Sequence, residues 1–112
     1  MLERELQKGI VDVAKILGYR VHHTRPAWTS KGYRTPIQGH VGFVDLVLAG
    51  HGRVLFVELK CGRNVLSAEQ AAWLEALRAA GQEAYVLTDA EWGSGEIEAL
   101  LKRGTRHEGV AA

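Results

Sequence analysis

The sequence contains few features that would cross-link a small protein, anchor it in a membrane or direct its secretion. A single cysteine, Cys61, excludes an internal disulfide, and a lone thiol does not form a zinc motif. No apolar run approaches the roughly 18 residues of a membrane helix. The first residues also lack the basic and then apolar order of a signal peptide. A chain of 112 residues can bury one core but not two. We expect one cytoplasmic domain over residues 1–103, with residues 104–112 as a frayed tail.

A large excess of charge of one sign is absent too, because the formal net charge is +1. The charges are nevertheless unevenly distributed. No acidic residue lies between Asp12 and Asp45, and this stretch holds Lys15, Arg20, Arg25, Lys31 and Arg34 together with His22, His23 and His40. A local basic surface attracts a polyanion even on a balanced chain, so we expect nucleic acid as the partner.

The segment 25–42 contains both prolines and is predicted to be a long loop. Trp28 and Tyr33 lie in it among several cations. One interpretation is that these aromatic rings stack on DNA bases while phosphates are contacted by Arg20, Arg25, Lys31 and Arg34. The alternative is that the rings fix the loop to the core or to a second subunit.

Periodicity predicts the other elements. Apolar residues at three- and four-residue steps predict helices over 3–17 and 67–80, and a short helix around 97–101. Runs of β-branched and aromatic residues predict strands over 19–24, 43–49, 54–60 and 84–87. The order α-β-β-β-α-β-α predicts an α/β domain with a central mixed sheet flanked by helices.

Three charged residues interrupt two of these strands. Asp45 falls within the apolar run 43–48, and Glu58 and Lys60 fall at the end of the run 54–60. An unpaired buried carboxylate is costly, and a divalent metal is the strongest compensation for it. Solvated ion pairs between strand ends are the alternative explanation.

The turn between these strands decides whether the acids meet. Residues 50–53 read Gly-His-Gly-Arg, a composition suited to a hairpin. An even loop places Asp45 directly opposite Glu58, on the same face of the sheet. A three-residue loop places Asp45 opposite Val57 and, without a bulge, sends the two acids to opposite faces. A shared site requires the even register.

In that register the charged residues suit phosphodiester hydrolysis. Glu58 and Lys60 share one face of their strand because they are two residues apart. Two carboxylates can hold Mg²⁺ or Mn²⁺ through oxygen, and the main-chain carbonyl of Leu59 is a further candidate ligand. Lys60 would then position or help deprotonate the attacking water, or offset charge in the transition state.

Three segments resemble the VRR-NUC branch of the PD-(D/E)xK nuclease superfamily. They are residues 42–46 (GFVDL), 56–60 (FVELK) and 67–77 (SAEQAAWLEAL), and residues 3–7 and 19–26 are similar to small phage-type members. The resemblance covers about residues 3–101 and implies a restriction-endonuclease-like domain that cleaves DNA with Mg²⁺ or Mn²⁺. It implies Asp45 and Glu58 as metal ligands and Lys60 as the catalytic lysine. Val44 stands where the family has proline, at a position that shapes the backbone and supplies no ligand.

The resemblance adds two site residues from the helices. It implies that Gln70 supports the site from the second helix, although a capping box between Ser67 and Gln70 explains the same glutamine. Glu3 matches a first-helix glutamate near the metal, and Glu5 is the second choice for this role. Both acids also suit the positive end of a helix dipole.

Stand-alone members of this branch are similar to Holliday-junction resolvases and act as homodimers, whereas related domains of larger proteins trim flaps. We therefore expect a homodimeric, structure-selective DNA endonuclease, acting in the host cytoplasm if it is phage-encoded. A flap or nicking nuclease is one alternative. A non-catalytic DNA-binding module that retains the fold is another, against which the intact Asp45, Glu58 and Lys60 argue.

Overall fold

The computed structural model describes residues 1–24, 27–29, 32–34 and 37–103, with the backbone alone at residues 27–29, 33 and 34. The tail expected from residue 104 lies outside these ranges. Within them, no helix has the length and apolar character that crossing a membrane requires. The elements in chain order are α1 (Glu3–Ile16), β1 (Arg20–His23), β2 (Ala27–Thr29), β3 (Gly32–Arg34), β4 (Leu46–Gly50), β5 (Arg53–Lys60), α2 (Ala68–Ala79), β6 (Glu83–Thr88), α3 (Asp89–Ser94) and α4 (Glu96–Lys102).

The main sheet has four strands in the order β1-β4-β5-β6. Strand β4 runs antiparallel to both β1 and β5, and β6 lies parallel to β5. A parallel pair needs a crossover, which α2 supplies between β5 and β6. The predicted central mixed sheet flanked by helices, in an α/β arrangement, is confirmed.

A two-residue turn fixes the pairing of β4 with β5. His51 and Gly52 form it with positive φ angles of 54° and 76°, as a type I′ hairpin requires. Pairing runs without a bulge from Gly50 opposite Arg53 to Leu46 opposite Val57. The hairpin therefore has the even register that a shared site requires, and one further step back along β4 brings Asp45 level with Glu58.

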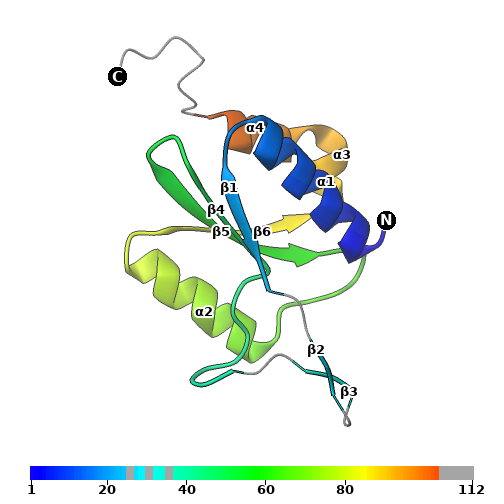
Figure 1. Ribbon diagram of the computed structural model, residues 1–112, viewed down its shortest axis with the longest axis vertical. Coiled ribbons are helices and arrows are strands. Elements are labelled where there is room, and N and C mark those ends of the chain that lie inside the picture. Colours follow the sequence, from blue (N-terminus) through cyan, green and yellow to red (C-terminus); the bar gives the residue numbers. More distant parts are fainter. Residues whose placement is uncertain (25–26, 30–31, 35–36, 104–112) are drawn as a thin grey trace.

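Helices cover both faces of the sheet (Figure 1). The face under α1, α3 and α4 holds the larger core, which includes Leu55, Val57 and Leu59 from β5. The face under α2 holds a smaller core, to which Phe56 of β5 contributes. Because side chains alternate along a strand, Glu58 belongs to the α2 face.

Three short elements were not predicted. The segment expected to be one long loop contains β2 and β3, which pair as a separate two-stranded sheet, and three-residue strands are too short to give a periodic signal. Helix α3 was missed as well: it starts from an N-cap at Thr88, and its Trp92 lies against Gly9 of α1. The strand expected from residue 43 begins only at Leu46, so Asp45 precedes β4 rather than lying inside it.

Arg53, at the start of β5, anchors the end of the sheet away from Glu58. It donates two hydrogen bonds to the carboxylate of Glu83 on β6 and one of 2.7 Å to the carbonyl of Arg103 after α4. The guanidinium lowers the pKa of the Glu83 carboxyl. This bidentate pair holds β5 and β6 in register beneath the end of α4.

Candidate functional site

Asp45 lies where the chain enters β4, beyond the last paired residues of β4 and β5. Its Oδ2 accepts a hydrogen bond of 2.8 Å from the main-chain N–H of Leu59 on β5. Because β4 begins only at Leu46, the Asp45 side chain takes the place of a β4 backbone partner for this amide of β5. This bond holds the Asp45 carboxylate beside Glu58.

Glu58 is the one buried charged residue in the described part of the chain, with 2% of its surface exposed. Its Oε2 accepts a hydrogen bond of 3.1 Å from Gln70 Nε2. Its Oε1 is also buried and has no hydrogen-bond partner among the described residues. A buried carboxylate oxygen without a partner is costly, because the carboxylate loses hydration without replacement.

The surroundings of Glu58 raise its pKa from the ordinary 4.5 to about 8. Burial is the largest cause, and the negative charge of Asp45 is the second. Lys60 lowers the pKa and the charge of Glu3 raises it, both by less. Adjacent carboxyl groups that resist joint ionisation are typical of sites that bind a cation or transfer a proton.

Lys60 points to the same face as Glu58. Its Nζ lies 3.7 Å from Glu58 Oε2, and 15% of its side chain is exposed. At this distance the two groups form an ion pair, but they are too far apart for a good hydrogen bond. The ammonium group therefore stays available to a further acceptor next to the two carboxylates.

Gln70, at the start of α2, has two roles in the structure. Its side-chain oxygen accepts from the main-chain N–H of Ser67, and its main-chain N–H donates to Ser67 Oγ, which completes the capping box. The side-chain nitrogen is left free to donate to Glu58. The two explanations of Gln70 given by the sequence are thus compatible.

The geometry separates the two first-helix acids. Glu3 Oε2 accepts a hydrogen bond of 2.6 Å from Asn64 Nδ2, in the segment after β5, and its charge acts on Glu58. Glu5 instead accepts from the main-chain N–H of Leu2 and closes the first turn of α1. The structure therefore places Glu3 near the site and leaves Glu5 as a helix cap. Asn64 was missed from the sequence because nothing in a short polar loop indicates its partner.

Asp45 and Glu58 have the donor chemistry that suits a hard divalent cation. They offer carboxylate oxygens from β5 and from the residue just before β4, and one of these oxygens, Glu58 Oε1, lacks a partner among the described residues. The N–H and C=O of one strand residue point to the same side, so the Leu59 carbonyl faces Asp45 as its amide does. Nowhere in the described ranges do three or more His, Cys, Asp or Glu side chains gather as a metal cluster. A cation here would depend on two side chains and on main-chain or solvent oxygen.

An open cleft of about 750 Å³ lies in front of Asp45. Its walls include Asp45 and Gly42 from the segment before β4, His23 and Thr24 from the end of β1, and Trp73 from α2. Glu58 is buried and does not line the cleft. Asp45 is therefore the member of the carboxylate pair that lines the cleft.

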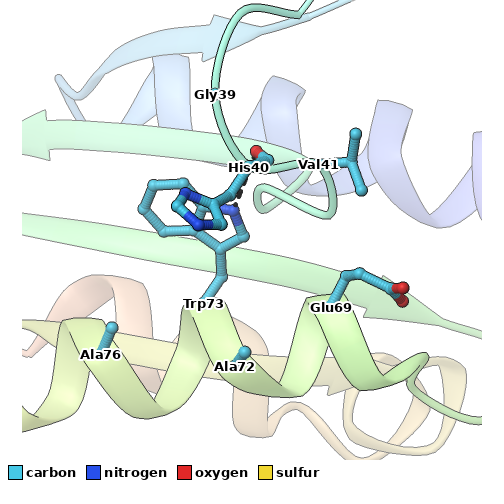
Figure 2. A pocket seen from close by; sticks show the side chains of 7 residues that line it. All are labelled: Gly39, His40, Val41, Glu69, Ala72, Trp73 and Ala76. Carbon is cyan, nitrogen blue, oxygen red and sulfur yellow. Dashed lines mark hydrogen bonds between the residues drawn. The ribbon is translucent and has the colours of Figure 1, made fainter.

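Aromatic packing holds the segment before β4 against α2. The Phe43 and Trp73 rings pack edge to face, with their centroids 4.8 Å apart. Trp73 Nε1 also donates a hydrogen bond of 3.3 Å to the His40 carbonyl. Figure 2 shows the His40 ring in front of Trp73, beside an apolar pocket of about 530 Å³ that Ala72 and Ala76 also line. Trp73 therefore has a structural role, because its ring contact and its hydrogen bond hold the wall of the cleft in place.

The predicted DNA-contacting residues are only partly described. Arg20 is exposed on β1, at the edge of the sheet. Arg25 and Lys31 lie outside the described residues. Residues 28, 33 and 34 lie on β2 and β3, where only the backbone is described, so contacts of Trp28, Tyr33 and Arg34 with DNA stay predictions.

No protein-family model matches the chain, and no curated protein matches it in sequence. Among solved structures it is similar to Hjc, a Holliday junction resolvase from the archaeal hyperthermophile Archaeoglobus fulgidus, with 21% identity and a TM-score of 0.46. The match covers 74% of this chain and 65% of the resolvase, so the chain spans less than two thirds of that protein.

Proposed function

We propose that this protein is a divalent-metal-dependent, structure-selective DNA endonuclease that hydrolyses phosphodiester bonds. The observation that supports the proposal is the convergence of Asp45, Glu58 and Lys60 at one end of β5, with Glu58 Oε1 buried and without a partner among the described residues. If Glu58 and Lys60 formed only a structural ion pair, no second carboxylate would be expected beside Glu58. No Glu58 oxygen would then be buried without a partner.

The proposed metal is Mg²⁺ or Mn²⁺, held by Asp45 and Glu58 with the Leu59 carbonyl as a further candidate ligand. Such an ion would polarise the phosphate and lower the pKa of the attacking water. The raised pKa of Glu58, about 8, means that metal binding at neutral pH has to displace a proton from this acid.

The side chains divide the remaining work. The Lys60 ammonium group, 3.7 Å from Glu58, lies where it can orient the attacking water or stabilise negative charge on the phosphate. Gln70 holds Glu58 Oε2 and so fixes the direction of the carboxylate. Glu3 adds negative charge from α1, and this charge favours the binding of a cation at the site.

The resemblance to stand-alone VRR-NUC proteins supports a homodimer that acts on four-way junctions, in the cytoplasm of a host cell if the gene is carried by a phage. A flap or a nicked duplex is the alternative substrate.

Cleavage of a labelled four-way junction with Mg²⁺ or Mn²⁺ tests the proposal. We expect cleavage by the wild-type protein, a loss of at least about 100-fold in Asp45→Asn, and a loss of about 100-fold or more in Lys60→Ala. Asp12→Asn and Lys8→Ala are matched controls, because these residues form an exposed pair with each other on α1. Flap, nicked and splayed substrates in the same assay rank the DNA structures.

Two outcomes would overturn the proposal. Binding of the junction without cleavage would favour a DNA-binding module that retains the fold. Cleavage unaffected by both site substitutions would place any nuclease activity elsewhere.

A further inference from the structure

A second hollow, of about 470 Å³, lies between α1 and β1. Its α1 wall is formed by Arg4, Gln7, Val11 and Lys15, and its β1 wall by Val21 and His23. We refer to it as the α1–β1 groove. It carries two cations and a histidine, and no acidic side chain lines it.

The spacing along α1 explains this wall. Positions 4, 7, 11 and 15 follow three- and four-residue steps and so share one side of the helix. Arg4 and Lys15 are eleven residues apart, which corresponds to about 16 Å along the helix axis. The groove therefore presents two positive charges at a distance that spans several phosphates of a nucleic acid strand.

The acids near these cations are occupied elsewhere. Glu3 binds Asn64, Glu5 binds the amide of Leu2, and Asp12 pairs with Lys8 outside the groove. Neither Arg4 nor Lys15 forms an ion pair with any residue that the structure describes. Their charges are consequently available to a ligand.

The groove leads to the candidate active site. His23 lines both the α1–β1 groove and the cleft that contains Asp45. Its Nδ1 lies 3.2 Å from Gln7 Nε2, which joins the two walls of the groove next to the cleft. The pairing of His23 with Leu46 puts this junction one residue from Asp45.

We propose that the α1–β1 groove binds the sugar-phosphate backbone of the DNA strand that extends from the cleft, with Arg4 and Lys15 contacting two of its phosphates. This inference rests on the proposed nuclease function and specifies the path of the strand. Lys15 belongs to the basic stretch that the sequence indicated, whereas Arg4 does not, because Arg4 is flanked by acids in the sequence and joins Lys15 only on the folded helix.

The salt dependence of DNA binding tests the groove. Fluorescence anisotropy with a labelled four-way junction, in EDTA and from about 50 to 200 mM salt, gives the slope of log K against log salt. We expect Arg4→Gln and Lys15→Gln each to reduce the magnitude of this slope by about 0.9, the value for one lost phosphate contact. Arg4→Lys should restore most of it.

Lys8→Gln is the matched control, since it removes the same charge from the same helix at a side chain that is 79% exposed and outside the groove. Equal slope changes in all three glutamine variants, or no change in any, would overturn the proposal that the α1–β1 groove binds DNA. If the wild-type protein cleaves DNA while the groove variants behave like Lys8→Gln, only this inference fails. If the wild-type protein neither binds nor cleaves DNA, the proposed function fails and the groove with it.

Discussion

The Gln70 side chain donates a hydrogen bond of 3.1 Å to Glu58 while it closes the capping box of α2. One amide group thereby links the start of a helix to a buried carboxylate on the neighbouring strand. The oxygen serves the helix and the nitrogen serves the site, so substitutions can separate the two.

Gln70→Glu should keep the cap and damage the site. A glutamate at this position can still accept from the Ser67 amide, but it cannot donate to Glu58 and it adds a negative charge beside the two site carboxyl groups. We expect cleavage to fall about 10- to 100-fold, with little change in the stability of α2. Ser67→Ala should do the reverse, with a loss of about 1 kcal/mol in stability and a smaller loss of activity. Urea unfolding and cleavage rates on the same samples measure both, and equal activity losses in the two variants would contradict this division.

Glu58 should make the metal-free protein less stable as the pH rises. Its pKa is about 8 in the folded state and near 4.5 when unfolded, so the folded protein binds more protons between these values. The free energy of unfolding then falls with pH across this window, at up to about 1.4 kcal/mol per pH unit. Glu58→Gln should flatten this dependence, which urea unfolding in EDTA from pH 5 to 8.5 measures. Glu75→Gln, at an exposed position of α2, is the control, and parallel profiles for wild type and Glu58→Gln would refute the expectation.

Mg²⁺ should stabilise the folded protein through Asp45 and Glu58. A ligand at 100 times its Kd contributes about 2.7 kcal/mol, which corresponds to a rise of several degrees in Tm. The rise should be larger at pH 8 than at pH 6, because Glu58 has to lose its proton to bind the ion. Thermal unfolding with and without Mg²⁺ checks this. Asp45→Asn should abolish the rise and Asp12→Asn should preserve it, whereas an equal rise in both variants would mean that the ion binds elsewhere.

Gly42 should be required for the approach of the cleft wall to α2. Its φ is +89°, and a Cβ added there would lie 2.7 Å from Glu69 Cβ and 2.9 Å from the Gln70 nitrogen. Gly42→Ala should therefore destabilise the protein by about 1–3 kcal/mol and reduce cleavage, because both Gln70 and Asp45 are displaced. Gly39→Ala is a matched control, since Gly39 also has a positive φ, +114°, but nothing lies within 4 Å of its added Cβ. Similar effects of the two substitutions, in urea unfolding and cleavage rates, would show that backbone strain alone is responsible.

The sequence was informative where local chemistry determines geometry. The composition of residues 50–53 indicated a hairpin but left the loop length open, and the structure has the even register that a shared site requires. Gln70 could be placed by its spacing from Ser67. Asn64 and Gly42 could not be found, because their partners lie in other elements and only the folded chain brings them together. Likewise, the strands β2 and β3 were hidden in a loop rich in glycine, proline and charge. Arg4 joined the basic groove only through the helical repeat of α1.

The most direct test is a crystal of the wild-type protein soaked with Mn²⁺, measured for anomalous scattering. We predict one strong peak in direct contact with carboxylate oxygens of both Asp45 and Glu58, with Glu58 Oε1 as a ligand and Lys60 beside it. A Mn²⁺ ion bound away from these residues, with the two carboxyl groups sharing a proton instead, would contradict a shared cation site.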